Sequence, residues 1–425
     1  MRKSTFASIA SLCMVPAALL WSQDSSAVPA FARKHQTSCY TCHSGFPNRN
    51  AFGEAFKNNG YRWPGGEEED HAKQEQTKMG GEGWKKIFPE SPWPTDIPGF
   101  APFALQVSGP MVNYADEQKY SSGAKNGKIK TAQTLNQGGP IDVNVLYGGT
   151  IGENLSVVGL LRSFAAGATS TELRATWAFS PGVNLGFGNG FGAFKGLSTP
   201  ISVYTGIFPA SGTATEFNYA VGKEGGFNLI AGVASAGTTN STEENVTTAN
   251  TSSNRLDDTR YARLKYKFFG AGLLSGAGGT YGNEYVGLDN SLAIGASLVS
   301  ARDGILTGTY SGETLVYGAD IAGNYGNFTA GVAYSRDSDL KLNNYAVDAG
   351  YYVYPWLLAR VKYTELGAAG GLTNPTWTPS LTAWLRANVS LAASYKAYAK
   401  NIAPIASGDQ YNNANTFTLT GSVAF

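Results

Sequence analysis

The chain has 425 residues and a nearly balanced charge, with 32 basic and 31 acidic side chains. This balance argues against a nucleic-acid partner, because such partners require a basic surface. The composition is also unusual for a soluble protein, since 53 glycines and 23 tyrosines accompany only 15% charged residues.

The first 27 residues have the pattern of a cleaved signal peptide. Arg2 and Lys3 precede an apolar stretch from Phe6 to Trp21, and small residues follow at 25–27, where a peptidase would cut. We therefore expect export from the cytoplasm, with Cys13 removed together with the leader.

A CxxCH motif at 39–43 follows, and it is typical of covalent c-type haem attachment. Cys39 and Cys42 would form thioethers with the haem vinyl groups, and His43 would be the proximal iron ligand. A CxxC pair could also be a redox dithiol, a disulfide or half of a zinc site. No second cysteine pair follows, and only His35 and His71 remain as further imidazoles. These are too few for the usual zinc spacings, so the motif predicts one haem c.

A short helix is predicted directly after this motif. Pro47 suits a helix start and Gly60 a helix stop. Phe52 and Phe56 are one turn apart on one face, where they could cover a porphyrin; packing on any small core is the alternative. We expect residues 28–64 to form a small α-helical monohaem cytochrome c domain with the haem as its core.

Residues 65–99 are rich in Gly, Pro and charge, which predicts a linker or an irregular plug segment. The acidic run at 67–70 could attract a metal cation, but a solvated charge run is the commoner explanation. Met79 and His71 are both candidates for the distal haem-iron ligand, because the chain can return there to the opposite haem face. His35 is expected on the proximal side or at the surface.

From residue 100 to 425 the pattern is period-two alternation, as at Leu264 and Tyr266 beside Arg263 and Lys265. Short turns alternate with longer polar segments. The longer segments are Tyr114 to Gly139, Gly237 to Asp258 and Asn401 to Asn413. This asymmetry, together with an aromatic C-terminal residue, predicts an all-β fold, a transmembrane antiparallel β-barrel of about sixteen strands in the bacterial outer membrane. A soluble β-sandwich or propeller is the alternative.

If the apolar faces contact outer-membrane lipid, the charged residues that alternate with them must face the lumen. The residues expected there are Arg162, Arg174, Arg263, Lys265, Lys267, Asp320, Asp348, Arg360 and Lys362.

The N-terminal motifs resemble a known family. The run from Pro29 to Arg33, the single CxxCH, Phe46-Pro47 and the run from Asn50 to Gly53 resemble the fused outer-membrane monohaem cytochrome-porins of iron-oxidising bacteria. The motif resemblance covers roughly Pro29 to Trp63, and the remainder is similar in architecture only. It implies an electron conduit that carries electrons from extracellular Fe(II) through the haem to a soluble periplasmic cytochrome c.

Oxidation of Fe(II) by one electron needs no general acid or base, so no catalytic residues are expected. Two other functions stay open. The barrel could be a porin for solute diffusion with a haem-bearing plug or regulatory domain, or the haem segment could be an anchored enzyme or gas sensor.

Overall fold

The computed structural model describes only part of the chain. The described residues are 29–45, 48–65, 71, 73, 76–77, 97–98, 102–120, 130–137, 141–163, 170–189, 213–234, 259–276, 281–283, 286–301, 314–338, 341, 343–365, 375–398, 410–411 and 415–425. The expected signal peptide, the acidic run at 67–70 and Met79 lie outside them.

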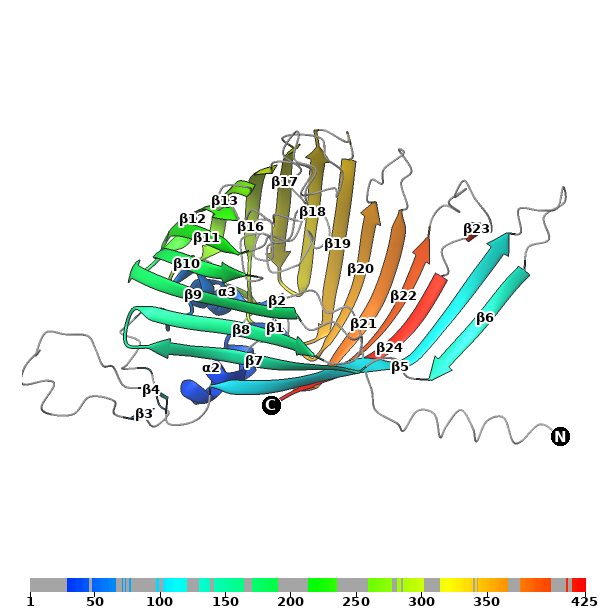
Figure 1. Ribbon diagram of the computed structural model, residues 1–425, viewed down its shortest axis with the longest axis horizontal. Helices are drawn as coiled ribbons and strands as arrows, with labels where there is room; N and C mark the ends of the chain where they lie inside the picture. Colours follow the sequence, from blue (N-terminus) through cyan, green and yellow to red (C-terminus); the bar gives the residue numbers. More distant parts are fainter. Residues whose placement is uncertain are drawn as a thin grey trace, which may run out of the picture.

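Within the described residues, eighteen strands form one closed antiparallel barrel (Figure 1). They are β5 (Phe103–Tyr120), β6 (Lys130–Gln137), β7 (Asp142–Ile151), β8 (Leu155–Ser163), β9 (Ser170–Ser180), β10 (Val183–Asn189), β11 (Ala214–Val221), β12 (Glu224–Ala234), β13 (Thr259–Ala271), β16 (Ser291–Ala301), β17 (Thr314–Tyr325), β18 (Phe328–Asp337), β19 (Asn343–Tyr354), β20 (Leu357–Glu365), β21 (Thr376–Arg386), β22 (Val389–Tyr398), β23 (Gln410–Tyr411) and β24 (Asn415–Ala424).

Sixteen of these strands make the continuous wall. Among the described residues, the other two strands, β6 and β23, are paired in register with β5 only. The barrel closes where β24 pairs with β5, with Val423 opposite Val107, and where β5 pairs with β7, with Phe103 opposite Tyr147. The predicted sixteen-strand barrel is thus confirmed.

The expected loop from Tyr114 to Gly139 is in part wrong. β5 continues to Tyr120 and pairs with β6, with Tyr114 opposite Leu135. A polar sequence does not prevent pairing here, because a ribbon that extends beyond the apolar band needs no apolar face.

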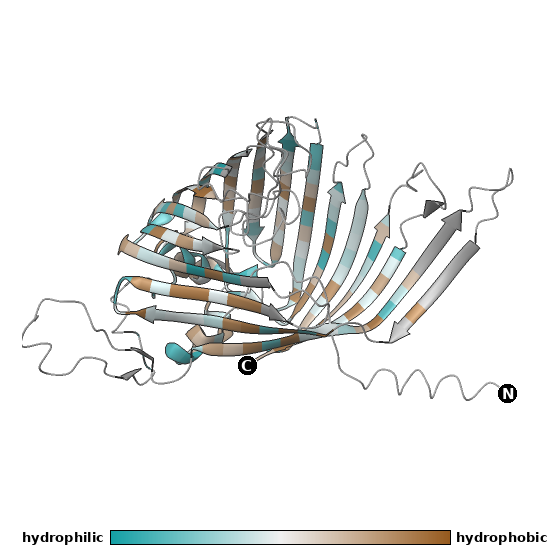
Figure 2. Cartoon of the chain, in the orientation of Figure 1, coloured by the Kyte–Doolittle hydropathy of each residue, from teal (hydrophilic) through white to brown (hydrophobic). Residues whose placement is uncertain are grey.

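The wall has an apolar outer face and a polar inner face. On β13, Leu264 is 46% exposed and Tyr266 is 45% exposed, whereas Arg263 is 2% exposed and Lys265 is 9% exposed. Figure 2 shows the same alternation of apolar and polar residues along the strands. A closed barrel with its apolar side chains outward is the arrangement of a transmembrane outer-membrane barrel, and it excludes the soluble sandwich and propeller.

The residues predicted to line the lumen do point inward where their side chains are described. Buried positions are Arg174, Arg263, Lys265, Lys267, Asp320 and Asp348, and partly buried positions are Arg360 and Lys362. The side chain of Arg162 lies outside the described part.

The two ends of the barrel differ. At one end the connections are tight turns, such as 152–154 and 181–182, and at the other end they span longer stretches, such as 190–213 and 235–258. In outer-membrane barrels the short turns face the periplasm. One connection at the short-turn end is long: residues 272–290 join β13 to β16 and contain the paired strands β14 (Tyr281–Asn283) and β15 (Leu288–Asp289).

The N-terminal segment is small and contains the expected helical region, together with one short pair of strands. It consists of α2 (Pro29–Lys34), the 3-10 turn η1 (Cys39–Thr41), the paired strands β1 (His43–Gly45) and β2 (Asn48–Arg49), and α3 (Ala51–Asn58). No helix in the described part of the chain is long and apolar enough to cross a membrane.

Helix α3 starts later than the expected start at Pro47. The side chain of Asn50 accepts a hydrogen bond from the Gly53 N–H at 2.9 Å and so caps the helix, which begins at Ala51. The predicted stop at Gly60 agrees with its φ of 71°, which a glycine adopts without strain.

The described residues of the 65–99 segment lie beside α2. β3 (Gln76–Thr77) pairs with β4 (Ile97–Pro98), so two points of the segment that are distant in sequence come together. The Lys73 N–H donates to the Lys34 carbonyl at 3.0 Å. Figure 1 shows β3 and β4 near α2. The role of residues 65–99 as a linker or a plug segment stays a prediction.

Candidate functional site in the barrel lumen

Residues 29–65, referred to below as the plug, contact the inner wall of the barrel. Figure 1 shows α3, β1 and β2 enclosed by the strands. The Ser156 hydroxyl on β8 donates to the Gly60 carbonyl at 2.5 Å, and the hydroxyls of Ser44 and Tyr352 on β19 are 3.2 Å apart. Because β8 and β19 lie on nearly opposite sides of the wall in strand order, the CxxCH segment lies within the lumen.

Polar contacts anchor α3 at the short-turn end. The Asn184 side-chain amide on β10 donates to the Asn58 carbonyl at 2.9 Å, and the Asn58 amide donates to the Leu273 carbonyl at 2.9 Å. The Asn59 amide donates to the Leu274 carbonyl at 2.5 Å. The long connection at 272–290 therefore folds inward and holds the end of α3.

A charged contact holds the other face of α3. Arg49 pairs with Glu54 at 2.9 Å, and Lys265 on β13 lies 3.7 Å from Glu54. Although burial acts to raise the pKa of Glu54, these two cations hold it well below its usual range. Glu54 is therefore an anion throughout the physiological pH range.

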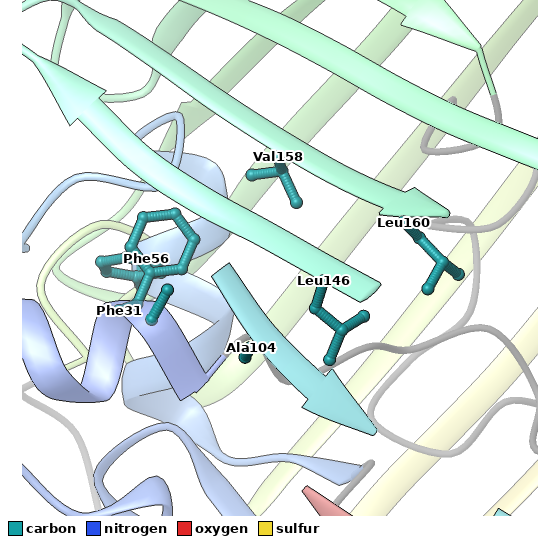
Figure 3. Packing of buried hydrophobic residues seen from close by; sticks show 7 residues of the cluster. Phe31, Phe56, Ala104, Leu146, Val158 and Leu160 are labelled. Carbon is teal, nitrogen blue, oxygen red and sulfur yellow. The ribbon is translucent and has the colours of Figure 1, made fainter. Parts of the chain in front are cut away.

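An apolar cluster joins the plug to β5, β7 and β8 (Figure 3). Its members are Ala30, Phe31, Phe56, Ala104, Leu146, Val158 and Leu160. The Phe31 and Phe56 rings meet edge to face at 5.1 Å, so Phe56 contributes to docking on the wall. Phe52 instead packs against Trp63 at 4.9 Å. The predicted packing of Phe52 and Phe56 on a porphyrin stays a prediction.

The CxxCH turn is bound to the start of α3. The Asn50 amide donates to the carbonyls of Tyr40 and Thr41 at 3.0 and 3.1 Å. A Cβ on Gly53 would lie 2.1 Å from the carbonyl oxygen of Cys42, so only glycine permits this approach. The sequence contained this signal as the run from Asn50 to Gly53, but its role in seating the turn becomes visible only in the structure.

The two thiols are in a setting that disfavours a thiolate. Cys39 and Cys42 are free of disulfide bonds and partly buried. Burial raises the pKa of Cys42 to about 12 and also raises the pKa of Cys39. A redox dithiol or a zinc site needs thiolates, whereas a thioether sulfur is uncharged. The described residues contain no cluster of three or more His, Cys, Asp and Glu side chains suited to a metal ion. The residues present are thus compatible with a covalent haem, and the raised thiol pKa values do not favour a redox dithiol or a zinc site.

The other two histidines gather around Trp63. The rings of Trp63 and His35 are 4.8 Å apart, and those of Trp63 and His71 are 5.2 Å apart and nearly parallel. His35 is 3% exposed, so the expected surface position is wrong. It is buried because its own ring packs on Phe56 and on Trp63. His71 remains a predicted distal ligand.

Comparison with known proteins yields only remote likenesses. No protein-family model matches the chain, and no curated protein matches its sequence. Among solved structures it is similar to OmpT, an outer membrane protein of Vibrio cholerae, with 14% identity, 77% of this chain and 98% of that chain covered, and a TM-score of 0.41. It is also similar to Salmonella typhi OmpF in complex with daunomycin, with 11% identity, 78% of this chain and 98% of that chain covered, and a TM-score of 0.45. A mutant of the Rh. blastica porin is similar with 11% identity, 75% of this chain and 100% of that chain covered, and a TM-score of 0.38.

Proposed function

We propose that this outer-membrane barrel is an electron conduit with one haem c attached to Cys39 and Cys42 and bound through iron to His43. The observation that carries the proposal is the position of the plug, which contains the CxxCH segment and contacts the wall on several sides through Ser44, Glu54, Asn58 and Gly60. When bound, the haem supplies an iron that accepts and releases one electron.

A lumenal position suits electron transfer because the apolar layer of an outer-membrane barrel is about 25 Å tall and insulates the two compartments from each other. The plug contacts the short-turn end, which corresponds to the periplasmic side. Cys39 and Tyr40 are partly or largely exposed, whereas His43 is buried. This arrangement would keep the iron ligand away from water and leave one edge of the site accessible to a soluble partner.

The proposed partners are extracellular Fe(II) as the donor and a soluble periplasmic cytochrome c as the acceptor. Fe(II) loses one electron and becomes Fe(III), so the chain has to position the haem and limit water access, and no side chain has to move a proton. A donor would enter from the long-loop end and pass the charged lumen wall before it reaches the plug.

Solute diffusion is the second candidate, and the lumen wall favours it. Buried ion pairs on this wall join Arg174 to Glu216 at 2.6 Å and Arg263 to Asp320 at 2.6 Å. A charged, polar interior of this kind is a property of barrels that pass solutes. In that case the plug would regulate the pore.

Two measurements on purified protein in detergent and in planar bilayers separate the candidates. For a conduit, Fe(II) should reduce the covalent haem, and the intact protein should pass little ion current. A variant with both Cys39→Ser and Cys42→Ser should keep the barrel and lose the reducible haem. Failure of Fe(II) to reduce the haem across pH 4–8 would remove the donor assignment. Large steady currents through the intact protein would favour the porin.

A further inference from the structure

Three histidines occur in the chain, and the proposed function uses one of them, His43, as an iron ligand. Of the other two, His35 is buried and His71 is only partly buried. His35 directly follows α2, and its backbone N–H donates to the Phe31 carbonyl at 3.1 Å. The imidazole is therefore held on an ordered helix end inside the plug.

The hydrogen bond of the His35 ring defines its tautomer. His35 Nδ1 lies 3.1 Å from the carbonyl oxygen of His71. A carbonyl oxygen can only accept, so Nδ1 carries the proton and the lone pair lies on Nε2. An Nδ1–H donated to a backbone carbonyl is the usual support of a histidine that binds a metal through Nε2, because it sets the ring orientation and raises the basicity of the ligand.

The surroundings of His35 connect it to the CxxCH turn. The centroid of its ring lies 6.1 Å from that of Phe56 and 4.8 Å from that of Trp63. The ring centroids of Trp63 and Phe52 are 4.9 Å apart. Phe52 precedes Gly53, which packs directly on the Cys42 backbone. A chain of aromatic contacts therefore connects the CxxCH turn with His35, which lies only four residues before Cys39.

His71 has a different part in this arrangement. Its ring lies nearly flat on Trp63, with an interplanar angle of 18°, and its carbonyl is the acceptor for His35. His71 therefore orients the His35 ring through its backbone carbonyl and packs its own ring on the Trp63 indole.

We propose that His35 is the second axial ligand of the haem iron, oriented by the backbone carbonyl of His71, so that the iron is bound by two imidazoles. The inference rests on the proposed function, since it assigns the open coordination position of that haem. It also implies a lower reduction potential than a histidine–methionine pair would give, because methionine ligation raises the potential.

The test is spectroscopic and uses the full-length holoprotein in detergent. Absorption, near-infrared magnetic circular dichroism and electron paramagnetic resonance spectra of the oxidised wild type should show low-spin iron with two nitrogen ligands. In His35→Ala the iron should become high-spin and bind carbon monoxide after reduction, and added imidazole should restore the low-spin spectrum. His71→Ala is the matched control and should stay low-spin, since the backbone carbonyl remains.

A second variant distinguishes loss of an iron ligand from misfolding of the protein. His35→Met should show a methionine-to-iron charge-transfer band and a higher reduction potential than the wild type, with heat-modifiable gel mobility as the check on barrel formation. Low-spin iron that is unchanged in His35→Ala would overturn the assignment, and so would a methionine band in the wild type. A wild type without covalent haem would instead refute the proposed function.

Discussion

The Asn184 side-chain amide donates a hydrogen bond to the backbone carbonyl of Asn58 at 2.9 Å, across 126 positions of sequence. Asn184 belongs to the wall and Asn58 ends the helix of the plug. The same Asn58 donates its own side-chain amide to Leu273, so one residue joins the plug to the wall and to the infolded 272–290 connection. The retention of the plug depends on such contacts.

Asn58→Ala should loosen the plug without changing the wall. Loss of a buried amide that leaves the Leu273 carbonyl unsatisfied costs about 1–3 kcal/mol. We expect single-channel recordings to show openings at least several times more frequent than in the wild type. Asn388→Ala is the matched control, because its amide also donates to a backbone carbonyl, that of Ala424 at 2.6 Å, but within the wall. Equal opening frequencies in both variants would contradict this role of Asn58.

Gly53→Ala should impair haem attachment, because a Cβ at this position would overlap the Cys42 carbonyl and force the turn away from α3. The expected result is a lower haem-to-protein ratio, measured by the pyridine haemochrome spectrum. Gly149→Ala on β7 serves as the control, since its Cβ would meet Pro102 at an ordinary 3.5 Å. A normal haem content in Gly53→Ala would show that the turn can be seated without this close contact.

Docking of the plug should strengthen as the pH rises from 7 towards 10. Burial, followed by the neighbouring Arg49, lowers the pKa of Lys57 to about 7, although Glu54 and Glu216 act to raise it. A free lysine titrates near 10.4. Between these two pKa values the docked state binds fewer protons than the undocked state, so docking becomes more stable as the pH rises. Below pH 7 Lys57 is charged in both states, and the full free-energy cost of burying its ammonium group opposes docking.

Bilayer conductance measured from pH 6 to pH 9.5 provides the test, with fewer openings expected at the alkaline end. Lys57→Met keeps the length of the side chain and removes the titration, so its opening frequency should vary less with pH. A variant with the same pH dependence as the wild type would assign the effect to another group.

Asp320→Asn should destabilise the barrel itself. Arg263 and Asp320 form a buried pair with Nη1 and Oδ2 2.6 Å apart, so neutralising the carboxylate removes this counter-charge from the buried guanidinium, at a cost of about 3–5 kcal/mol. The temperature at which the barrel loses its compact mobility on gels should fall. The double variant Arg263→Met, Asp320→Leu should recover much of the loss, and a double variant as unstable as Asp320→Asn would argue against charge burial as the cause.

Much of the architecture could be read from local patterns. Period-two alternation along residues such as Arg263 and Leu264 indicates which face of a strand is wet, because successive side chains of a strand point to opposite faces. The same pattern gave the strand number correctly. It failed between Tyr114 and Tyr120, where pairing with β6 extends the strand beyond the apolar band and the alternation carries no burial signal.

The candidate site divides in the same way. The amino-acid sequence by itself determined the CxxCH motif at Cys39, Cys42 and His43, which predicts haem attachment, since covalent attachment chemistry depends on adjacent residues. Only the tertiary structure decided that this motif lies in the lumen and that His35 is buried beside Trp63. The physical reason is that Asn58, Asn184 and Leu273 meet only after the barrel has closed, and contacts between residues so far apart leave no periodic pattern along the chain.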